Sequence, residues 1–355
     1  MKKVIPFFLV CITFLKLQAQ VIEGIVYDVR TNETVPGVAI YLNGTSIITT
    51  SDKDGYFKLF IEESINTTLI FSHLSYESLT YSPPFDKLGH SFFLSEKVNQ
   101  LEVAVVQADR ISRENKMKVF KEHFLGTTIS GKSCIIVNEE DIMLHFDNET
   151  NRLIAFATDP IIIENKYLGY RIFFHLQDFT IQYAENAKNM NSITHVSFSG
   201  TCLFNDLSPF DLKITTRRND IYSRSNAFFW KSFASNTLKE AKFKIYNRGK
   251  QFDPDQFFAI TKTASQVEVA IKPATNIDRH YEGMRSPVSG VIRVVHNGLS
   301  DSEIIFLTPS FSIDLFGNID AIHDIIYYGD MGDQRLGDML PLNYSFSPTT
   351  ARSRR

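Results

Sequence analysis

The chain has 355 residues and a formal net charge of −3, with 37 Lys and Arg against 40 Asp and Glu. Binding the phosphates of a nucleic acid needs clustered positive charge. The only basic cluster in this acidic chain is the last four residues, so we do not expect a nucleic acid as partner. The length predicts two or three domains. Thirty Phe and fourteen Tyr supply side chains that favour β-sheet and buried cores.

The first twenty residues have the layout of a secretory signal peptide. Two lysines precede an apolar run over residues 4–15, and Ala19 supplies the small residue before the expected cleavage point. This run is too short for a membrane anchor, which needs about 20 residues, and Cys11 lacks the small residue before it that lipidation requires. We expect residues 1–20 to be removed on export. The remaining chain, peripheral to a membrane at most, has 34 basic and 40 acidic residues, a charge of −6.

Residues 21–95 combine short strands with turn-forming dipeptides, which predicts a small sandwich. Large apolar residues recur at every second position over residues 38–42 and 57–61, so that they share one face of each expected strand, the period of a half-buried strand. Glycine follows Pro, Asn or Asp at the turns, where it supplies a positive φ. The core of this sandwich is expected to include Ile25, Val38, Ile40, Phe57, Leu59 and Phe71.

Three motifs of this segment occur in the order known from one family: Gly24–Asp28 (GIVYD), Val35–Ile40 (VPGVAI) and Ser51–Phe57 (SDKDGYF). The segment resembles the carboxypeptidase-regulatory-like domain, which is a transthyretin-like sandwich of seven strands. Ser51 stands where the family usually has Thr. The resemblance implies this fold over residues 21–95 and implies no activity.

Residues 96–118 are a polar connector in which the apolar run Leu101–Val106 predicts one extra strand. We expect residues 119–345 to form a β-rich α+β domain and residues 346–355 to be a disordered tail. The fold class is therefore mainly β: an N-terminal seven-stranded transthyretin-like β-sandwich, followed by the α+β domain.

Two segments of this second region have helical spacing, residues 116–125 and residues 211–238, with Thr215-Thr216 as the weak point of the second. Strands are expected at Cys134–Val137, Leu153–Phe156, Ile161–Ile163, Tyr170–Leu176, Ile193–Phe204, Lys242–Tyr246, Val267–Ile271, Val288–Val295, Glu303–Leu307 and Ile322–Tyr328.

The second region also carries a resemblance, to exported proteins of Gram-negative bacteria that have the same N-terminal sandwich and no assigned activity. The segments that recur are Phe124–Thr128, Cys134–Asn138, Ile163–Asn165, Leu168–Tyr170 and Arg335–Tyr344. The chain departs from these proteins at Arg224 and Phe228, where Gly and His are expected. The resemblance implies a location in the periplasm or on the periplasmic face of the outer membrane.

Gly126–Ser133 (GTTISGKS) matches the Walker A pattern, but a P-loop follows a strand and opens a helix. Here a helical segment precedes the motif and a strand follows it. We therefore expect a helix-to-strand loop that binds no nucleotide and leaves Lys132 in solvent. Asp52–Gly55 begins like a calcium loop, but Ile61 stands where the loop needs Glu, so we predict a hairpin turn.

The sequence contains none of the short motifs His-x-x-Glu, His-Glu-x-x-His and Gly-x-Ser-x-Gly. It thus carries no signature of a metallopeptidase or of a serine hydrolase. We assign no catalytic, cofactor-binding or metal-binding residue and expect no cofactor.

Glu164, Asn165 and Trp230 are the candidates for lining a cleft. Glu164 and Asn165 follow an apolar strand, and Trp230 belongs to an aromatic cluster that could stack on a sugar. The alternatives are a hydrogen-bonding role at the strand end and an aromatic core. Cys134 and Cys202 lie in apolar strands and are expected to be buried and unpaired.

These observations favour a non-catalytic binding or scaffolding protein of the cell envelope, with an envelope protein or a glycan as partner. Two alternatives stay open. One is a hydrolase acting on envelope or imported glycans or peptides, with an acid pair that sequence spacing does not reveal. The other is an accessory of a TonB-dependent uptake system.

Overall fold

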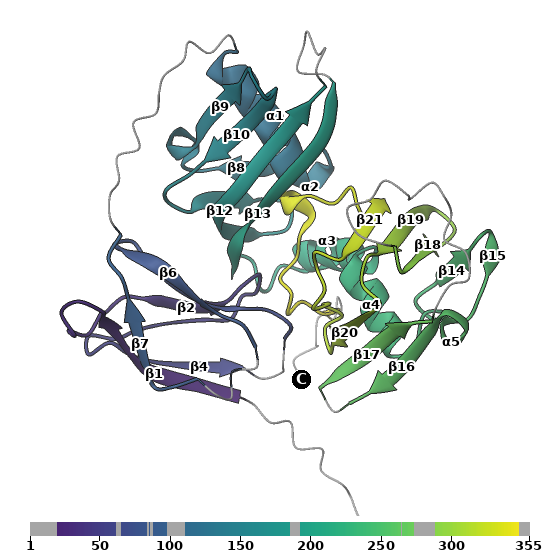
Figure 1. Ribbon diagram of the computed structural model, residues 1–355, viewed down its shortest axis with the longest axis horizontal. Helices are drawn as coiled ribbons and strands as arrows, with labels where there is room; N and C mark the ends of the chain where they lie inside the picture. Colours follow the sequence, from purple (N-terminus) through teal and green to yellow (C-terminus); the bar gives the residue numbers. More distant parts are fainter. Residues whose placement is uncertain are drawn as a thin grey trace, which may run out of the picture.

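The computed structural model describes residues 20–347, except residues 62–64, 84, 86–87, 98–110, 185–191, 264 and 273–287. The signal peptide, the strand predicted at Leu101–Val106 and the tail beyond residue 347 lie outside the described residues. The protein is mainly β, as predicted, and its sheets form three lobes around a C-terminal segment (Figure 1). Each lobe has its own hydrophobic core.

The first lobe, which we call the sandwich, contains the seven strands that the sequence predicted. They form a three-stranded sheet of order β4-β1-β7 and a four-stranded sheet of order β3-β2-β5-β6. The strands are β1 (Gln20–Asp28), β2 (Ala39–Leu42), β3 (Ile48–Thr50), β4 (Tyr56–Ile61), β5 (Leu69–His73), β6 (Tyr76–Tyr81) and β7 (Ser91–Leu94).

Five of the six predicted core residues are buried in the sandwich, and Ile25 is not. In β1 the inward-facing residues are Ile22, Gly24, Val26 and Asp28, so Ile25 lies on the outer face. The prediction was one residue out of phase because Gly24, which has no side chain, faces inward. A Cβ on Gly24 would lie 2.7 Å from the ring of Phe92, so the glycine makes room for that core residue.

The Asp52–Gly55 segment is a turn, but it does not form a hairpin. It connects β3 to β4, which belong to different sheets. The side chain of Asp52 accepts hydrogen bonds from the backbone N–H groups of Asp54 and Tyr56, both at 2.9 Å, which holds the turn closed.

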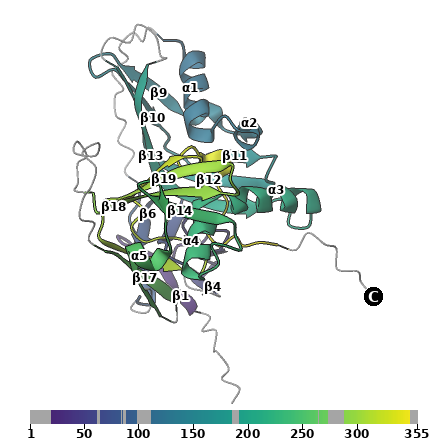
Figure 2. The same cartoon turned by 90° about the vertical axis from the view of Figure 1, so that its right-hand side faces the viewer.

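The second lobe, the middle unit, has a six-stranded sheet of order β8-β11-β12-β10-β9, with β13 paired to β12. Figure 2 shows α1 lying along this sheet. Ser112 caps α1, and Gly126 ends it with a φ of 95°. The elements are α1 (Arg113–Leu125), α2 (Ile129–Lys132), β8 (Cys134–Ile136), the 3₁₀ turn η2 (Glu139–Asp141), β9 (Met143–Asp147), β10 (Arg152–Phe156), β11 (Ile161–Asn165), β12 (Tyr170–Tyr183) and β13 (Ile193–Asp206).

The helical segment predicted over residues 211–238 is two helices, α3 (Leu212–Ser223) and α4 (Asn226–Ala234). The chain breaks at Ser225, whose hydroxyl caps α4 by accepting from the N–H of Phe228 (3.1 Å). Thr215 and its neighbour, the predicted weak point, stay inside α3, because their hydroxyls bond to backbone carbonyls four residues earlier.

The third lobe, the C-terminal unit, has one sheet of order β15-β14-β18-β19-β21 and another of order β16-β17-β20. Aromatic residues of α4 pack into its core. Residues 119–345, expected as one domain, thus contain the cores of two units. The elements are β14 (Phe243–Asn247), β15 (Lys250–Gln251), α5 (Pro254–Phe257), β16 (Phe258–Lys262), β17 (Gln266–Ile271), β18 (Gly290–His296), β19 (Ser300–Phe306), β20 (Ser310–Asp314), β21 (Ile325–Gly329) and the 3₁₀ turn η4 (Leu336–Asp338).

Residues 335–347, which we call the strap, lie where the three units meet (the yellow segment in Figure 1). The backbone carbonyl of Gly337 accepts from the side-chain amide of Asn165 in the middle unit (2.8 Å). The backbone N–H of Leu342 donates to the carbonyl of Gly44 in the sandwich (2.8 Å). The strap therefore ties the C-terminal unit, from which it emerges, to the other two.

A direct contact also joins the sandwich to the middle unit. Thr45 forms a parallel β-bridge with Leu203 of β13, and Leu203 packs with Tyr41 and Ile70 of the sandwich. None of the described helices is long and apolar enough to cross a membrane.

Candidate functional site

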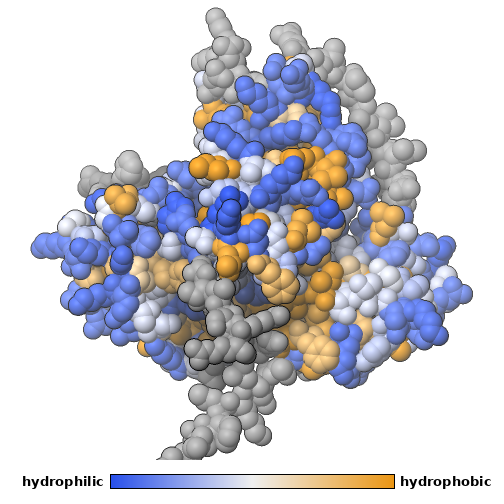
Figure 3. Space-filling model, turned by 180° about the vertical axis from the view of Figure 1, so that it is seen from behind, coloured by the Kyte–Doolittle hydropathy of each residue, from blue (hydrophilic) through white to orange (hydrophobic). Residues whose placement is uncertain are grey.

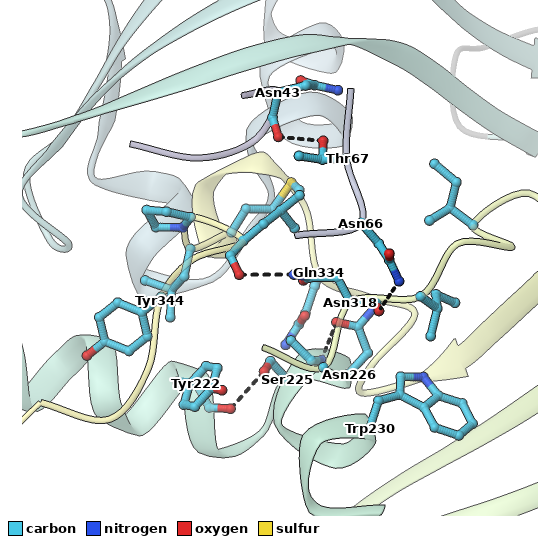
Figure 4. Close-up of a pocket in the computed structure, with 18 of the residues that line it drawn as sticks. Asn43, Asn66, Thr67, Tyr222, Ser225, Asn226, Trp230, Asn318, Gln334 and Tyr344 are labelled. Carbon is cyan, nitrogen blue, oxygen red and sulfur yellow. Dashed lines mark hydrogen bonds between the residues drawn. The ribbon is translucent and has the colours of Figure 1, made fainter. Parts of the chain in front are cut away.

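A cavity of about 690 Å³ lies at the junction of the three units. Its walls come from sandwich loops between residues 43 and 83, from the α3–α4 junction, and from residues 317–344 (Figure 4). This size is within the range of ligand-binding pockets, about 300–1,000 Å³. Apolar side chains (orange in Figure 3) gather near the middle of the molecule, where the lobes meet, whereas hydrophilic ones dominate the outer surfaces.

Besides hydroxyl groups, the described wall of the cavity carries five side-chain amides: Asn43, Asn66, Asn226, Asn318 and Gln334. An amide both donates and accepts hydrogen bonds, so this set suits a ligand with neutral hydroxyl or amide groups. One of the amides also connects the units across the cavity, since the side chain of Asn66 in the sandwich donates to the backbone carbonyl of Asn318 (3.3 Å).

Asp314 anchors this connection from behind the wall. Its carboxylate accepts from the backbone N–H of Asn66 (2.8 Å) and from both the backbone and the side chain of Asn318 (2.8 and 2.9 Å). Burial raises the pKa of Asp314, and these donors act in the opposite direction by stabilising its charged form. The sandwich loop is thus held on the C-terminal unit by one buried carboxyl group.

Four of the described residues that line the cavity are aromatic, Tyr222, Trp230, Tyr327 and Tyr344. Trp230 is only 1% exposed, and its indole N–H donates to the hydroxyl of Tyr327 (2.7 Å). The hydroxyl of Tyr344 donates to the side chain of Asn219 (2.7 Å). Trp230 therefore belongs to the core of the C-terminal unit and forms part of the cavity wall, where it cannot act as an open stacking platform.

Two buried polar atoms of the wall have no hydrogen-bond partner within the described part of the chain, the hydroxyl of Tyr222 and Oδ2 of Asp338. Tyr222 is 2% exposed and Asp338 is 8% exposed. Oδ1 of Asp338 accepts from the hydroxyl of Thr128 (2.7 Å). Burial raises the pKa of both groups, Asp338 and Tyr222. An unpaired buried polar atom costs about 1–3 kcal/mol, so the junction keeps two costly polar atoms behind the surface of the cavity.

The three predicted cleft residues do not come together. Asn165 is 1% exposed; its side-chain oxygen accepts from the N–H groups of Tyr167 and Leu168, and its amide donates to the strap. Glu164 points to the other face of β11 and pairs with Arg171 (2.6 Å). Of the three candidates, Trp230 alone lies in the cavity wall.

The Walker-like segment docks the strap. The segment contains the one-turn helix α2, which the sequence did not predict, between α1 and β8. Ser130 donates to the carbonyl of Gly337 (2.5 Å), and Gly131 lies so close to Gly337 that a Cβ on Gly337 would be 2.5 Å from the Cα of Gly131. Lys132 is exposed, as predicted.

Cys134 and Cys202 are both free, as predicted, but Cys134 is only partly buried. Cys134 begins the edge strand β8, and Cys202 lies in the interior of β13. Over the residues that the structure describes, no group of three His, Cys, Asp or Glu side chains is arranged to hold a metal ion.

No pattern in the sequence indicated the cavity, because its walls combine segments that lie far apart along the chain. Tyr222 was part of an expected amphipathic helix, and Asp338 belonged to a recurring C-terminal segment without a role of its own. One signal was available: several Asn and Gln residues follow strand ends and helix starts, where side-chain amides bind backbone groups or ligands.

Comparison with known families assigns the first lobe. The family model of the CarboxypepD_reg-like domain matches residues 22–106. No protein with a curated description matches the sequence. The matched range covers strands β2 to β7 and all but the first two residues of β1, in the two-sheet arrangement described above. The N-terminal lobe of this chain is therefore a CarboxypepD_reg-like domain.

Proposed function

We propose that this protein is a non-catalytic binding protein of the cell envelope, and that it holds a glycan in the cavity at the junction of its three units. The observation that carries the proposal is the composition of the wall, in which side-chain amide and hydroxyl groups lie beside apolar and aromatic side chains. Sugar hydroxyls donate and accept hydrogen bonds as these groups require.

The carboxyl groups of the wall support binding over hydrolysis. Two aspartates line the cavity, Asp320 and Asp338. Asp320 is engaged through both oxygens, which accept from the backbone N–H and the hydroxyl of Ser312 (2.8 and 2.9 Å). Glycoside hydrolysis usually needs two carboxyl groups, one as acid and one as base or nucleophile, at the scissile bond. The carboxylate of Asp320 is already bonded to Ser312 and stabilises its own turn, so it does not supply the second group.

The export signal supports a place in the envelope. Two lysines, an apolar run and Ala19 precede Gln20, the first residue of β1. Cell fractionation followed by N-terminal sequencing tests this part of the proposal. A periplasmic or outer-membrane protein that begins at Gln20 or Val21 is expected, and a cytoplasmic protein that retains residue 1 would contradict it.

A glycan microarray followed by calorimetric titration of the best ligand tests the binding function. Ile322 lies at the cavity and is 64% exposed, so Ile322→Trp adds bulk at the mouth without entering a core. Leu299→Trp is the control, because Leu299 is 88% exposed and lies away from the cavity. We expect Ile322→Trp to weaken binding at least about tenfold. Equal affinity in both variants would refute the assignment of the cavity.

The hydrolase alternative has one observation in its favour, the buried carboxyl of Asp338 with its raised pKa, a property of general acids. The array ligand therefore also has to be incubated with the protein and its reducing ends counted. Turnover that disappears in Asp338→Asn would replace the binding function by a hydrolytic one.

A further inference from the structure

The sheet β4-β1-β7 of the sandwich has an outer face that is largely apolar and open to solvent. This sheet lies on the side of the sandwich away from the middle unit (Figure 1). Outward-facing positions of a sandwich are normally polar, because they meet water. Six of the nine outward-facing residues of these three strands are apolar or aromatic: Val21, Ile25, Tyr27, Tyr56, Phe60 and Phe93.

The aromatic rings of this face meet water in a single copy of the chain. Phe60 is 60% exposed and Phe93 is 46% exposed. Tyr27 stacks on Phe93 at one end of the face, with the ring centres 5.5 Å apart. Contiguous exposed apolar surface of this kind marks an interaction site. The opposite outer face of the sandwich already is one, since its residues Tyr41 and Ile70 pack on the middle unit.

One ion pair lies in the middle of the face. Lys58 of β4 is opposite Glu23 of β1 in the sheet, and its ammonium group lies 2.9 Å from Oε2 of Glu23. The hydroxyl of Tyr56 donates to the same oxygen (3.0 Å). A lipid surface does not fit this centre, because hydrocarbon would leave the two charges without water.

The register of β1 and β4 makes the face complementary to a second copy of itself. Sheets that pack face to face keep their strands aligned to within about 30°. A two-fold axis that runs between β1 and β4, parallel to both, places each outward residue of β1 over the β4 residue that is its neighbour within one chain. Each acid then meets a base, and each apolar residue meets another. The neighbouring pairs are Val21 with Phe60, Glu23 with Lys58, and Ile25 with Tyr56.

We propose that the mature protein forms a two-fold dimer through the outer face of the sheet β4-β1-β7. Glu23 of one copy pairs with Lys58 of the other, and the reverse pair forms as well. Phe60 packs on Val21 of the other copy, one row away. None of these residues lines the junction cavity, so the dimer is independent of the proposed glycan binding.

The size of the face sets the strength of the dimer. The span from Val21 to Tyr27, at about 3.4 Å per residue, and three strands about 4.8 Å apart give a face of about 340 Å². A stable interface buries about 800 Å² per partner. We therefore expect a reversible dimer whose dissociation constant lies in the micromolar range.

Sedimentation velocity of the mature protein, from low to high micromolar concentration, tests for the dimer. We expect the sedimentation coefficient to rise with concentration from that of a monomer to that of a dimer. Phe60→Ser should weaken the dimer about tenfold, because it removes apolar area from the contact. Phe210→Ser is the control, because Phe210 is 94% exposed and lies before α3, outside this face. A native protein that stays monomeric, or equal losses in both variants, would overturn the proposal.

Exchanging the two charges tests the geometry. Lys58→Glu and Glu23→Lys each place like charges opposite each other in the dimer, so each variant alone should dissociate at least about tenfold more readily. An equimolar mixture should associate again, because one copy then carries two acids and the other two bases at matching positions. Lys250→Glu and Glu240→Lys change the net charge equally at exposed positions of the C-terminal unit, and both controls should dimerise like the native protein.

The mixture separates this dimer from any other use of the face. Two variants that stay monomeric when mixed would overturn the two-fold arrangement, and variants that each dimerise like the native protein would place the interface elsewhere. Lys58 and Glu23 are both exposed, so circular dichroism should show an unchanged fold in each variant. Ile322→Trp should leave the dimer unchanged, so a failure of this proposal and a failure of the glycan site can be told apart.

Discussion

Replacing Gly337 by alanine should open the contact between the strap and the middle unit. An added Cβ would lie 2.5 Å from the Cα of Gly131 and 2.5 Å from the carbonyl oxygen of Leu125. Both are backbone atoms, so no side chain can rotate away, and the strap itself has to move.

The magnitude follows from what the movement breaks. Overpacking of a well-packed contact costs about 1–3 kcal/mol. The carbonyl of Gly337 also accepts from Ser130 (2.5 Å) and from Asn165 (2.8 Å), and each lost hydrogen bond costs about 1 kcal/mol more. We expect Gly337→Ala to lower the free energy of unfolding by about 2–5 kcal/mol in total.

Urea unfolding followed by far-UV circular dichroism measures this change. Hydrogen exchange at residues 126–133 reports the local contact, since α2 should lose protection first. Gly89→Ala is the control, because Gly89 has no positive φ and nothing within 4 Å of its added Cβ. If Gly337→Ala shifts the urea midpoint no further than Gly89→Ala does, the strap does not dock as described.

Three further outcomes are expected. Ser51→Ala should lower the free energy of unfolding, measured with urea, by about 2–3 kcal/mol. The buried hydroxyl of Ser51 donates to the backbone carbonyl of Val35 and accepts from the backbone N–H of Val38, both at 2.9 Å, and the variant loses both bonds. A loss below about 0.5 kcal/mol would contradict this. Burial raises the pKa of Asp338 above its unfolded value of about 3.9, so the free energy of unfolding of the native protein falls as the pH rises from 4 to 7 and this carboxyl loses its proton. The side chain of Asp338→Asn does not titrate, so this variant should gain stability relative to the native protein over the same range. A stability difference that is constant with pH would refute the reasoning. Burial raises the pKa of Cys134 and of Cys202 to about 12, so a disulfide reagent at pH 8 should modify neither thiol until urea is added, and rapid reaction of either in the folded protein would show a thiolate that the structure does not predict.

The sandwich was the most predictable part of the fold, because alternation and turn chemistry act over a few neighbouring residues. The motif containing Ser51 carried the family resemblance, and the structure gives that residue a reason: its hydroxyl joins two backbone groups across the sandwich edge. The error at Ile25 had a local cause as well. An inward glycine leaves the apolar side chain beside it as the stronger signal.

Most described strands of the second region were predicted, but β9, β15, β16 and β20 were missed, and the division of the region into two cores was not predicted either. An apolar run such as that of β12 or β18 does not indicate its partner strands, and only these partners assign the two strands to different sheets. The helix break was misplaced for a related reason. Threonines lower helix propensity on average, yet the local hydroxyl bonds of Thr215 and its neighbour and the cap at Ser225 decided where the chain turned.

The candidate site lay beyond sequence reasoning because it consists of contacts between units. Asn66 and Asn318 meet across the cavity although they are 252 residues apart in the chain. Asp338 is notable because it is buried and because one of its carboxyl oxygens has no hydrogen-bond partner among the described residues. Neither property can be read from the sequence.

The strap imposes an order on biosynthesis. Residues 335–347 are made after every residue that they contact in the sandwich and the middle unit. The sandwich and the middle unit can therefore fold and meet as they emerge, but the contacts that the strap makes with both of them form only when it arrives. A chain that stalls or is cleaved before Arg335 would expose the apolar centre of the molecule, so intact synthesis of this short segment acts as a checkpoint for the whole protein.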